Sequence, residues 1–174
     1  RYMMPAMPIF FLWGLAGVQE IFSELRSFRW GKSAVTAWGL TLALMWLAFL
    51  GIGAKSYAED VAFIESEMVL TAKWVAENIP SDALIAAHDI GALGYFDGRE
   101  LVDLAGLVSP EVIPFIRNEE KLTQYLVERN VDYLIVFPTW YTTLPEELPL
   151  VYNTGSYIAP SIGGENMVVY KWVH

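Results

Sequence analysis

The sequence predicts an α/β fold in two parts. Residues 1–54 are expected to form a membrane anchor of two transmembrane helices, and residues 55–174 a soluble mixed-sheet α/β domain that ends in an antiparallel hairpin. Two apolar stretches, at residues 3–18 and 34–54, come before a polar, acid-rich remainder. In that remainder, short β-rich runs alternate with helical patterns, and the last two runs follow one another. This order favours a mixed sheet with helices packed on it.

The two apolar stretches carry the membrane prediction. Residues 34–54 hold no charge, and as a helix they would be about 30 Å long, which is enough to cross a bilayer core. Residues 3–18 are fewer and contain Pro5 and Pro8, but proline is tolerated near a helix start, so we expect this stretch to span as well. A signal peptide is the alternative for either stretch, although a basic leading region and a clear cleavage site are missing.

The connection between the stretches predicts the orientation. Residues 19–33 contain Arg26, Arg29 and Lys32, and short loops rich in such residues stay in the cytoplasm. We therefore expect a multi-pass protein of the cell membrane whose C-terminal domain is extracytoplasmic. The absence of cysteine fits an exported domain and a reducing compartment equally well.

The charge is distributed unevenly along the chain. Residues 55–174 hold 18 acidic and 7 basic residues, whereas residues 1–54 hold 2 acidic and 4 basic ones. An acidic domain has no basic face with which to replace the counterions of phosphates, so nucleic acid is not expected as a partner. The lipid bilayer is the first partner that the sequence predicts.

The elements of the domain follow from periodicity and turn residues. Apolar residues spaced by three and four predict a helix over about 58–78, closed by Pro80, and Asn118 is a candidate cap for a second helix. The predicted strands are residues 83–88, 101–104 and 131–138, followed by a hairpin of 148–158 and 165–173.

The segment after the first predicted strand is the first candidate site. His88 and Asp89 stand at its carboxyl end, where open α/β sheets bind ligands, and Gly91 and Gly94 follow. The glycine spacing departs from that of a dinucleotide-binding loop, so nucleotide binding is weakly indicated. The simpler interpretation is that Asp89 caps a turn over residues 90–96 and His88 is hydrogen-bonded at the sheet end.

Two further residues complete the candidate site. Asp103 closes the second strand, so it could lie beside Asp89 and bind a sugar hydroxyl or a cation, or cap its loop. With two histidines and no cysteine, we expect no metal site, and no catalytic triad is visible. Trp140 and Tyr141 follow the third strand and could stack on a sugar ring, pack the loop on the sheet, or lie near the membrane surface.

Two stretches resemble a known family. Arg1-Tyr2-Met-Met-Pro5-Ala-Met-Pro8, followed by an apolar helix, is similar to the R-Y-x-x-P-x-x-P segment of bacterial polytopic glycosyltransferases of the GT-C type, the mannosyltransferase and aminoarabinose-transferase-like group. Residues 76–112, AENIPSDALIAAHDIGALGYFDGRELVDLAGLVSPEV, look like the C-terminal extracytoplasmic domain of that group.

The resemblance implies transfer of a sugar from a polyprenyl-phosphate carrier to a glycan or protein acceptor, without a cofactor. The family's catalytic carboxylate lies in an early outer loop, so this chain would be an inactive C-terminal fragment with no catalytic residue of its own. Arg1 and Tyr2 would lie at the outer membrane boundary, where Arg1 either pairs with the carrier phosphate or only anchors the helix.

Two other functions fit the same sequence. One is a non-catalytic, membrane-anchored binding domain of the cell envelope, because every feature of residues 55–174 also has a structural explanation. The other is a tethered nucleotide-binding enzyme, which would require the domain to be cytoplasmic.

Overall fold

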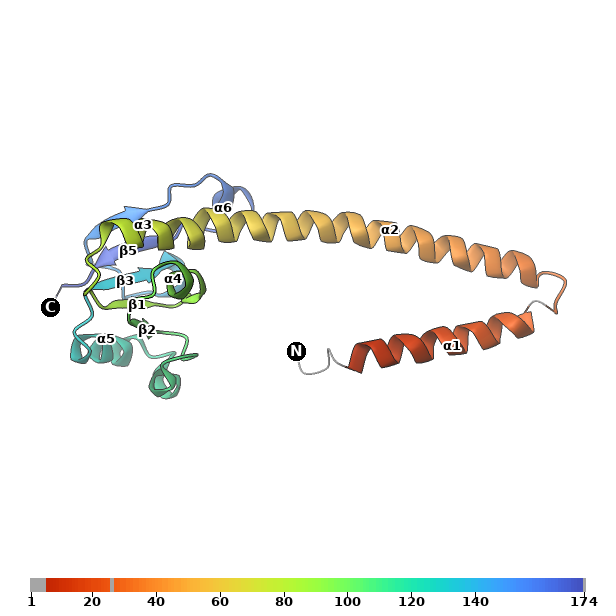
Figure 1. The fold of residues 1–174 in the computed structure, drawn as a ribbon, viewed down its shortest axis with the longest axis horizontal. Coiled ribbons are helices and arrows are strands. Elements are labelled where there is room, and N and C mark those ends of the chain that lie inside the picture. Colours follow the sequence, from red (N-terminus) through yellow and green to blue (C-terminus); the bar gives the residue numbers. More distant parts are fainter. Residues whose placement is uncertain (1–5, 26, 174) are drawn as a thin grey trace. The chain divides into compact units, whose positions relative to one another are not determined.

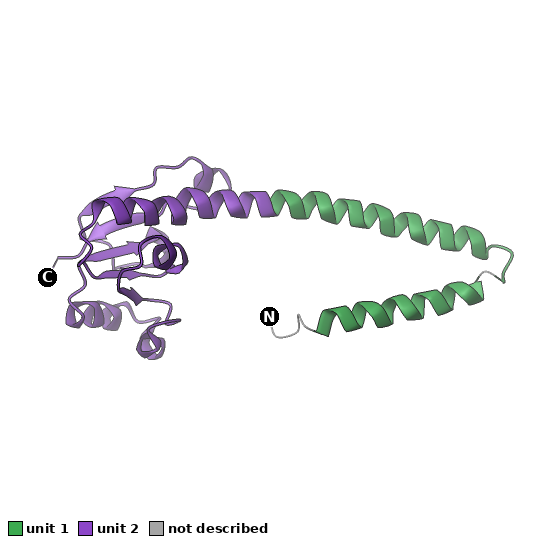
Figure 2. Ribbon diagram, viewed as in Figure 1, with its two compact units in different colours: residues 1–56 green, residues 57–174 purple. Residues whose placement is uncertain are grey.

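The computed structural model describes residues 6–25 and 27–173, and the chain divides into two compact units, residues 1–56 and 57–174 (Figure 2). Arg1 and Tyr2 lie outside the described residues. The first unit contains α1 (Met7–Leu25) and most of α2 (Gly31–Phe63). Within it, the rings of Phe22 and Trp38 meet edge to face, with centroids 4.8 Å apart.

The helical run from Gly31 to Asn78 is the one helix in the described part of the chain that is long and apolar enough to cross a membrane. Its apolar window is fully unburied, unlike a core helix, although a signal sequence passes the same test of length and composition. The described part of α1 does not pass that test, and its C-terminal half contains Gln19, Glu20 and Glu24. A second span, and the side of the membrane that each end faces, stay predictions.

The helices differ in extent from the sequence-based expectation. The connection predicted at residues 19–33 is shorter, because α1 continues to Leu25 and α2 begins at Gly31. The helix predicted at 58–78 is not a separate helix. It is the continuation of α2, which passes through a π-helical segment, η2 (Ile64–Val69), into α3 (Leu70–Asn78). The end at Asn78 is as predicted.

The second unit holds a mixed five-stranded sheet in the order β2-β1-β3-β5-β4 (Figure 1). Its strands are β1 (Ile85–Ala87), β2 (Leu101–Asp103), β3 (Tyr133–Val136), β4 (Leu150–Asn153) and β5 (Val168–Lys171). β1 pairs in parallel with β2 and β3, while β5 is antiparallel to β3 and β4. The predicted α/β class, the mixed sheet and the terminal hairpin are confirmed.

Helices cover both faces of this sheet (Figure 1). Alternate side chains of a strand point to opposite faces, so Ile85 and Ala87 pack with α3 and α4 (Gly91–Phe96), while Ala86 packs with α5 (Glu119–Glu128). The shorter helices are η3 (Pro110–Phe115), η4 (Pro138–Trp140) and α6 (Ile158–Ser161). The predicted cap is present, since the Asn118 side chain accepts a hydrogen bond from Lys121 N–H at 3.0 Å.

Candidate functional site

The predicted site residues gather at the carboxyl end of the three parallel strands. His88 and Asp89 follow β1, Asp103 is the last residue of β2, and Trp140 lies in η4 just after β3. Ala87 pairs with both Asp103 and Ile135, so the three strands end close to one another. This is the end of an open α/β sheet at which ligands usually bind.

Asp103 organises a loop. Its side chain is fully buried, and its two carboxylate oxygens accept hydrogen bonds from Ala105 N–H and Val108 N–H, each at 2.8 Å. Its own backbone N–H donates to the Ser109 hydroxyl at 3.1 Å. The loop after β2 is thus wrapped around the carboxylate, which supports the capping interpretation of Asp103 over a direct role in binding.

Asp89 also belongs to its own loop. Its Oδ1 accepts a hydrogen bond from Gly91 N–H at 3.2 Å, in the first turn of α4. Asp89 and Asp103 both lie near His88, and their negative charges favour the protonated imidazole. The sequence predicts that the two carboxylates lie side by side. In the structure both lie near His88, and each accepts hydrogen bonds from its own loop.

His88 joins the loop after β1 to the loop after β3. Its Nδ1 is hydrogen-bonded to the Tyr141 hydroxyl at 2.8 Å, and its ring meets Trp140 edge to face at 4.6 Å between centroids. Partial burial lowers the pKa of His88 below its usual value of 6.5, against the opposing charges of Asp103 and Asp89. Burial raises the pKa of Tyr141, so its phenol stays protonated at neutral pH. The uncharged His88 ring therefore supports the Trp140 ring from one side.

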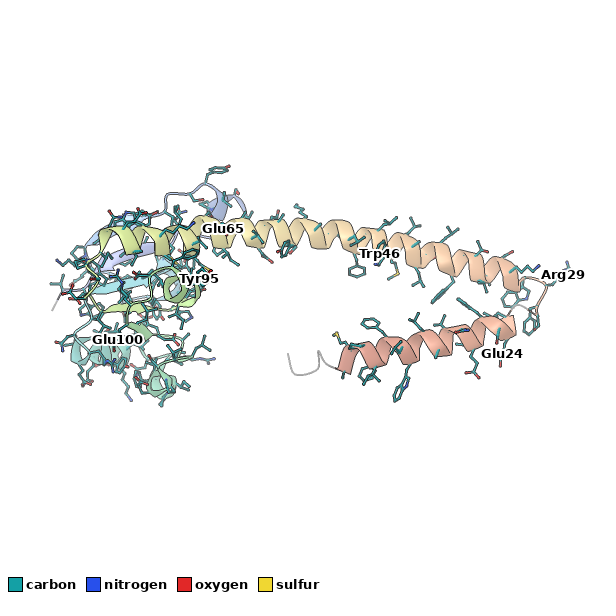
Figure 3. The ribbon with its side chains drawn as sticks, viewed as in Figure 1. Glu24, Arg29, Trp46, Glu65, Tyr95 and Glu100 are labelled. Carbon is teal, nitrogen blue, oxygen red and sulfur yellow. The ribbon has the colours of Figure 1, made fainter. Side chains whose placement is uncertain are left out.

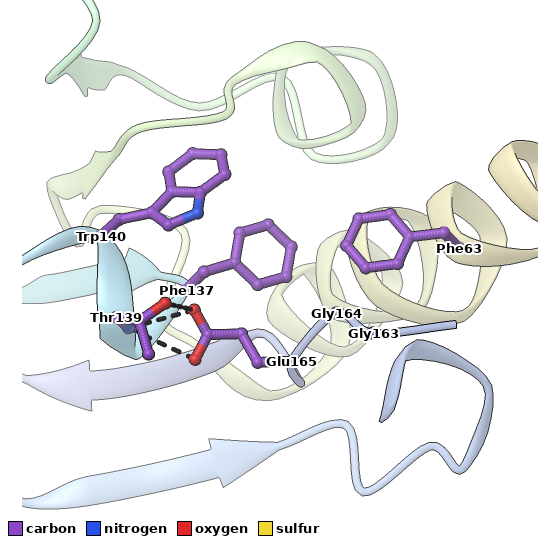
Figure 4. A pocket seen from close by; sticks show the side chains of 7 residues that line it. All are labelled: Phe63, Phe137, Thr139, Trp140, Gly163, Gly164 and Glu165. Carbon is purple, nitrogen blue, oxygen red and sulfur yellow. Dashed lines mark hydrogen bonds between the residues drawn. The ribbon is translucent and has the colours of Figure 1, made fainter. Parts of the chain in front are cut away.

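An open pocket of about 350 Å³ lies in front of Trp140 (Figure 4). Its lining is largely aromatic on one side and polar on the other, and consists of Phe63, Phe137, Thr139, Trp140, Gly163, Gly164 and Glu165. The rings of Phe63 and Phe137 stack with centroids 5.5 Å apart, and the centroids of the Phe137 and Trp140 rings are 5.0 Å apart. The aromatic row thus runs from the helix across the end of β3 to His88.

Glu165 forms the polar side of the pocket. It accepts hydrogen bonds from Thr139 N–H, at 3.0 and 3.3 Å to its two oxygens, and also from the Thr139 hydroxyl (Figure 4). A carboxylate has about four acceptor positions, so two donor groups leave acceptor capacity for a ligand hydroxyl. No lysine or arginine lines the pocket, and the site therefore suits a neutral, hydroxyl-bearing ligand better than a phosphate.

Gly164 makes the pocket possible. A Cβ at this position would lie 2.8 Å from Cε2 of Phe63, closer than real Cβ atoms approach, and 3.3 Å from the carbonyl oxygen of Ala159. A residue with any side chain would push the Phe63 ring out of place. The glycine pair at 163 and 164 is the one sequence signal that could have indicated this part of the site.

A second carboxylate fixes the wall of the pocket from behind. Glu67, in η2, is fully buried and accepts hydrogen bonds from the Thr154 hydroxyl, from Met167 N–H at 2.8 Å and from the Asn166 amide at 3.2 Å. These partners lie 87, 100 and 99 residues away in the sequence. Glu67 therefore ties the helix that carries Phe63 to the strand connection that carries Glu165.

The described residues of this end of the sheet form a pocket but no cluster suited to a metal ion. Among the described residues, no group of three or more His, Cys, Asp or Glu side chains could hold a metal ion. Trp140, His88, Asp89 and Asp103 lie at the strand ends that the sequence predicts, and Trp140 lines the pocket directly. The sequence does not indicate Phe63, Phe137 and Glu165 as neighbours, because their proximity arises from long-range packing.

Comparison with known proteins gives one family and no relative. Residues 55–170 match the family model described as a domain of unknown function (DUF8728). No curated protein matches the chain, and no solved structure does. The matched range begins at Lys55, immediately after the uncharged apolar stretch, and ends at Tyr170 in the last strand.

Proposed function

The chain belongs to the DUF8728 family, and from that premise we propose that it is a membrane-anchored domain that binds the sugar part of a glycan or glycolipid. The observation that carries this proposal is the pocket itself. Trp140 is about half exposed and lines an open cavity, and Glu165 lines the same cavity beside Thr139 (Figure 4).

The chemistry of the lining favours a sugar. One face of a pyranose is apolar and stacks on an aromatic ring, while its hydroxyls need hydrogen-bond acceptors and donors at the edge. Trp140 supplies the ring, and Glu165 supplies an acceptor that Thr139 holds in place. The cavity volume is at the lower end of the usual range for small-molecule sites, about 300–1,000 Å³, which suits one or two sugar rings.

The membrane context is part of the proposal. We propose that the helix containing residues 34–54 crosses the cell membrane and that the domain is extracytoplasmic, with the basic residues Arg29 and Lys32 on the cytoplasmic side. The resemblance to glycosyltransferases that use polyprenyl-phosphate-linked sugars supports a specific role, in which the domain helps such an enzyme to recognise its donor or acceptor.

A second function stays open on the same observation. The pocket holds one carboxylate, Glu165, and Thr139 N–H donates to both of its oxygens; this engagement favours a non-catalytic binding domain of the cell envelope as the alternative. The two functions differ in whether sugar transfer depends on the domain. Transfer measured in membranes that contain the natural protein should fall when Trp140 is replaced by alanine if the domain serves an enzyme, and should not change if it only tethers.

Binding itself is tested on the full chain in detergent micelles. Saturation-transfer NMR with methyl glycosides of common hexoses and with a polyprenyl-phosphate-linked hexose should identify a ligand. Trp140→Ala should then weaken its affinity by about five- to tenfold, the loss of about 1 kcal/mol of stacking. Trp140→Phe should keep most of the affinity, and Val127→Ala, a half-exposed residue of α5 outside the pocket, serves as the control.

Two outcomes would count against the proposal. If no sugar in the panel showed saturation transfer, sugars would be excluded as the ligand class. If the parent chain and Trp140→Ala bound a sugar equally well, the pocket would be excluded as its binding site.

A further inference from the structure

The sheet topology brings four connections to one end of the domain. β1, β2 and β3 are parallel, and β4 has the same direction because both β3 and β4 are antiparallel to β5. The connections that leave these four strands therefore all begin at the same end, which carries the pocket. We call this the carboxyl end of the sheet.

These connections share an unusual composition for an acidic domain. Each contains a run without a single charged residue, at residues 90–96, 104–110, 137–145 and 157–164. The connections at the opposite end hold most of the nearby charges, among them Asp82, Asp97, Arg99, Glu100, Arg129, Asp132, Glu146 and Glu147. Glu100, for example, points into solvent at that end (Figure 3).

The uncharged runs expose large apolar and aromatic side chains. Tyr95 is 80% exposed, Leu107 78%, Val108 62% and Tyr157 83%. Tyr95 lies in the first of these runs, Leu107 and Val108 in the second, and Tyr157 in the fourth. Tyr95 projects from α4 (Figure 3). Scattered single residues of this kind need no explanation, but their concentration on the tips of one end indicates a contact surface.

The carboxylates at this end are largely engaged within the domain. Asp89 accepts from Gly91 N–H, Glu165 from Thr139, and Glu111 from the Tyr125 hydroxyl at 2.7 Å. Glu119 accepts from the backbone and hydroxyls of residues 142–144. Arg117 precedes α5 and Glu120 lies in its first turn, and both side chains are exposed.

The chain enters the second unit at this same end. The stacking of Phe63, on the incoming helix, against Phe137, which directly follows β3, fixes that position. Tyr57, the first residue of the unit, is 72% exposed and stands three residues after Ala54, the last residue of the uncharged stretch. The carboxyl end of the sheet therefore follows closely after that stretch along the chain.

We propose that the carboxyl end of the second unit docks on the surface of the lipid bilayer. Leu107 and Val108 enter the boundary between headgroups and acyl chains, and Tyr57, Tyr95 and Tyr157 lie at the headgroup level, where amphipathic rings are favoured. The polar, acidic end faces the bulk solvent. This inference rests on the proposed membrane crossing of residues 34–54.

Docking also narrows the substrate class of the pocket. Phe63, Trp140 and Gly164 line a cavity on the docked end, so its mouth opens beside the lipid headgroups. The ligand that fits this position is the sugar of a lipid-linked saccharide. Its phosphate would stay outside the pocket, so the lining residues need no cation to balance the phosphate charge. A free sugar in bulk solvent would reach the same pocket less readily.

The absence of cysteine makes a depth measurement direct. Single cysteines are placed in the full chain at Leu107 and at Tyr157, labelled with an environment-sensitive fluorophore, and reconstituted into phospholipid vesicles with and without spin-labelled lipids. Leu150→Cys is the matched control, because Leu150 is 58% exposed at the start of β4, at the opposite end. Leu44→Cys, within the uncharged stretch, reports the membrane crossing itself.

We expect strong quenching of the label at positions 44, 107 and 157 and little at 150, with the depth of the Leu107 label about 5–10 Å into the interface. Quenching at 44 without quenching at 107 and 157 would overturn docking and leave the anchor intact. Quenching at none of the four would overturn the membrane crossing on which docking rests. Equal quenching at 107 and 150 would show an unoriented domain and would also overturn the proposal.

Discussion

Replacement of Glu67 by glutamine would test whether this buried carboxylate holds the pocket wall together. One oxygen of Glu67 accepts from the Thr154 hydroxyl and from Met167 N–H, and the other accepts from the Asn166 amide and, at 3.3 Å, from the Ser66 hydroxyl. Thr154, Met167 and Asn166 donate, while the single Ser66 hydroxyl hydrogen is shared between Glu67 and the Phe63 carbonyl, each at 3.3 Å. Glutamine offers a donor where one of these oxygens stood, so at least one donor must lose its acceptor.

The glutamine amide can take two orientations, and the expected loss of stability is that of the less costly one. If the amide nitrogen of glutamine replaces the oxygen near Asn166, the Ser66 hydroxyl can turn and accept, and the Asn166 hydrogen bond is lost. A hydrogen bond to a charged acceptor contributes about 1.5–3 kcal/mol, so we expect Glu67→Gln to destabilise the second unit by about 2 kcal/mol. For a unit of this size, that lowers Tm by about 6–10 °C.

The assay is thermal unfolding of the full chain in detergent, followed by near-ultraviolet circular dichroism of its tyrosines and tryptophans. Glu67→Ala should lower Tm further, since it leaves buried donors without an acceptor, at about 3–5 kcal/mol. Glu65→Gln is the control, because Glu65 is exposed on the same π-helical segment (Figure 3). A Tm for Glu67→Gln within about 2 °C of the parent chain would refute the reasoning, as surface substitutions produce changes of that size.

Three further predictions concern loops that shape the site. Burial raises the pKa of Glu119, but hydrogen bonds from Thr142, Thr143 and Leu144 outweigh it and lower that pKa to about 2. The contribution of Glu119 to stability is therefore complete above pH 4.5 and is lost as the pH falls towards 2, and Glu119→Gln should flatten acid unfolding in that range. Gly106→Ala should lower Tm, because Gly106 has φ of 78° and its Cβ would lie 2.7 Å from Cγ1 of Ile113. Gly164→Ala should displace Phe63 and weaken sugar binding, and should also lower Tm because the Phe63 ring stacks on buried Phe137, as measured by saturation-transfer NMR together with a thermal scan.

The sheet and the loops at the carboxyl ends of its strands were predictable because their signals are local. The β-rich runs, the Asn118 cap and the final hairpin each depend on residues close in sequence, and the positions of His88 after β1 and Trp140 after β3 follow from the strand predictions. The continuation of α1 to Leu25 was not predicted, since polar residues suit an exposed helix and a loop equally well.

The pocket wall could not be predicted because it depends on long-range partners. Apolar spacing indicates a helix around Ile64 but not the π-helical segment, in which Leu70 N–H donates to the carbonyl of Glu65, five residues earlier. That segment turns Glu67 inward to partners about 100 residues away, and it places Phe63 on Phe137. A single sequence contains no signal for such pairings.

The pH dependence of the site tests the role assigned to His88. Burial lowers its pKa below 6.5 while Asp103 and Asp89 oppose that effect, so the folded state binds a proton less readily than the unfolded state does. The contribution of neutral His88 to stability is therefore complete above pH 6.5 and declines as the pH falls from 6.5 to the lower folded pKa. Protonation turns Nδ1 into a donor, so the Tyr141 hydroxyl oxygen must accept, and it places a positive charge beside the Trp140 ring.

We expect the ring-proton resonance of His88, assigned by its loss in His88→Asn, to titrate with a midpoint below 6.5, and sugar affinity to fall over the same interval. His88→Asn should abolish the pH dependence of binding above pH 5 while keeping a polar partner for Tyr141, since asparagine does not titrate. A midpoint above 6.5 would mean that the two aspartates outweigh burial, and the imidazole would then be a cation beside the pocket. In that case its charge, and not its support of Trp140, would govern which sugars bind.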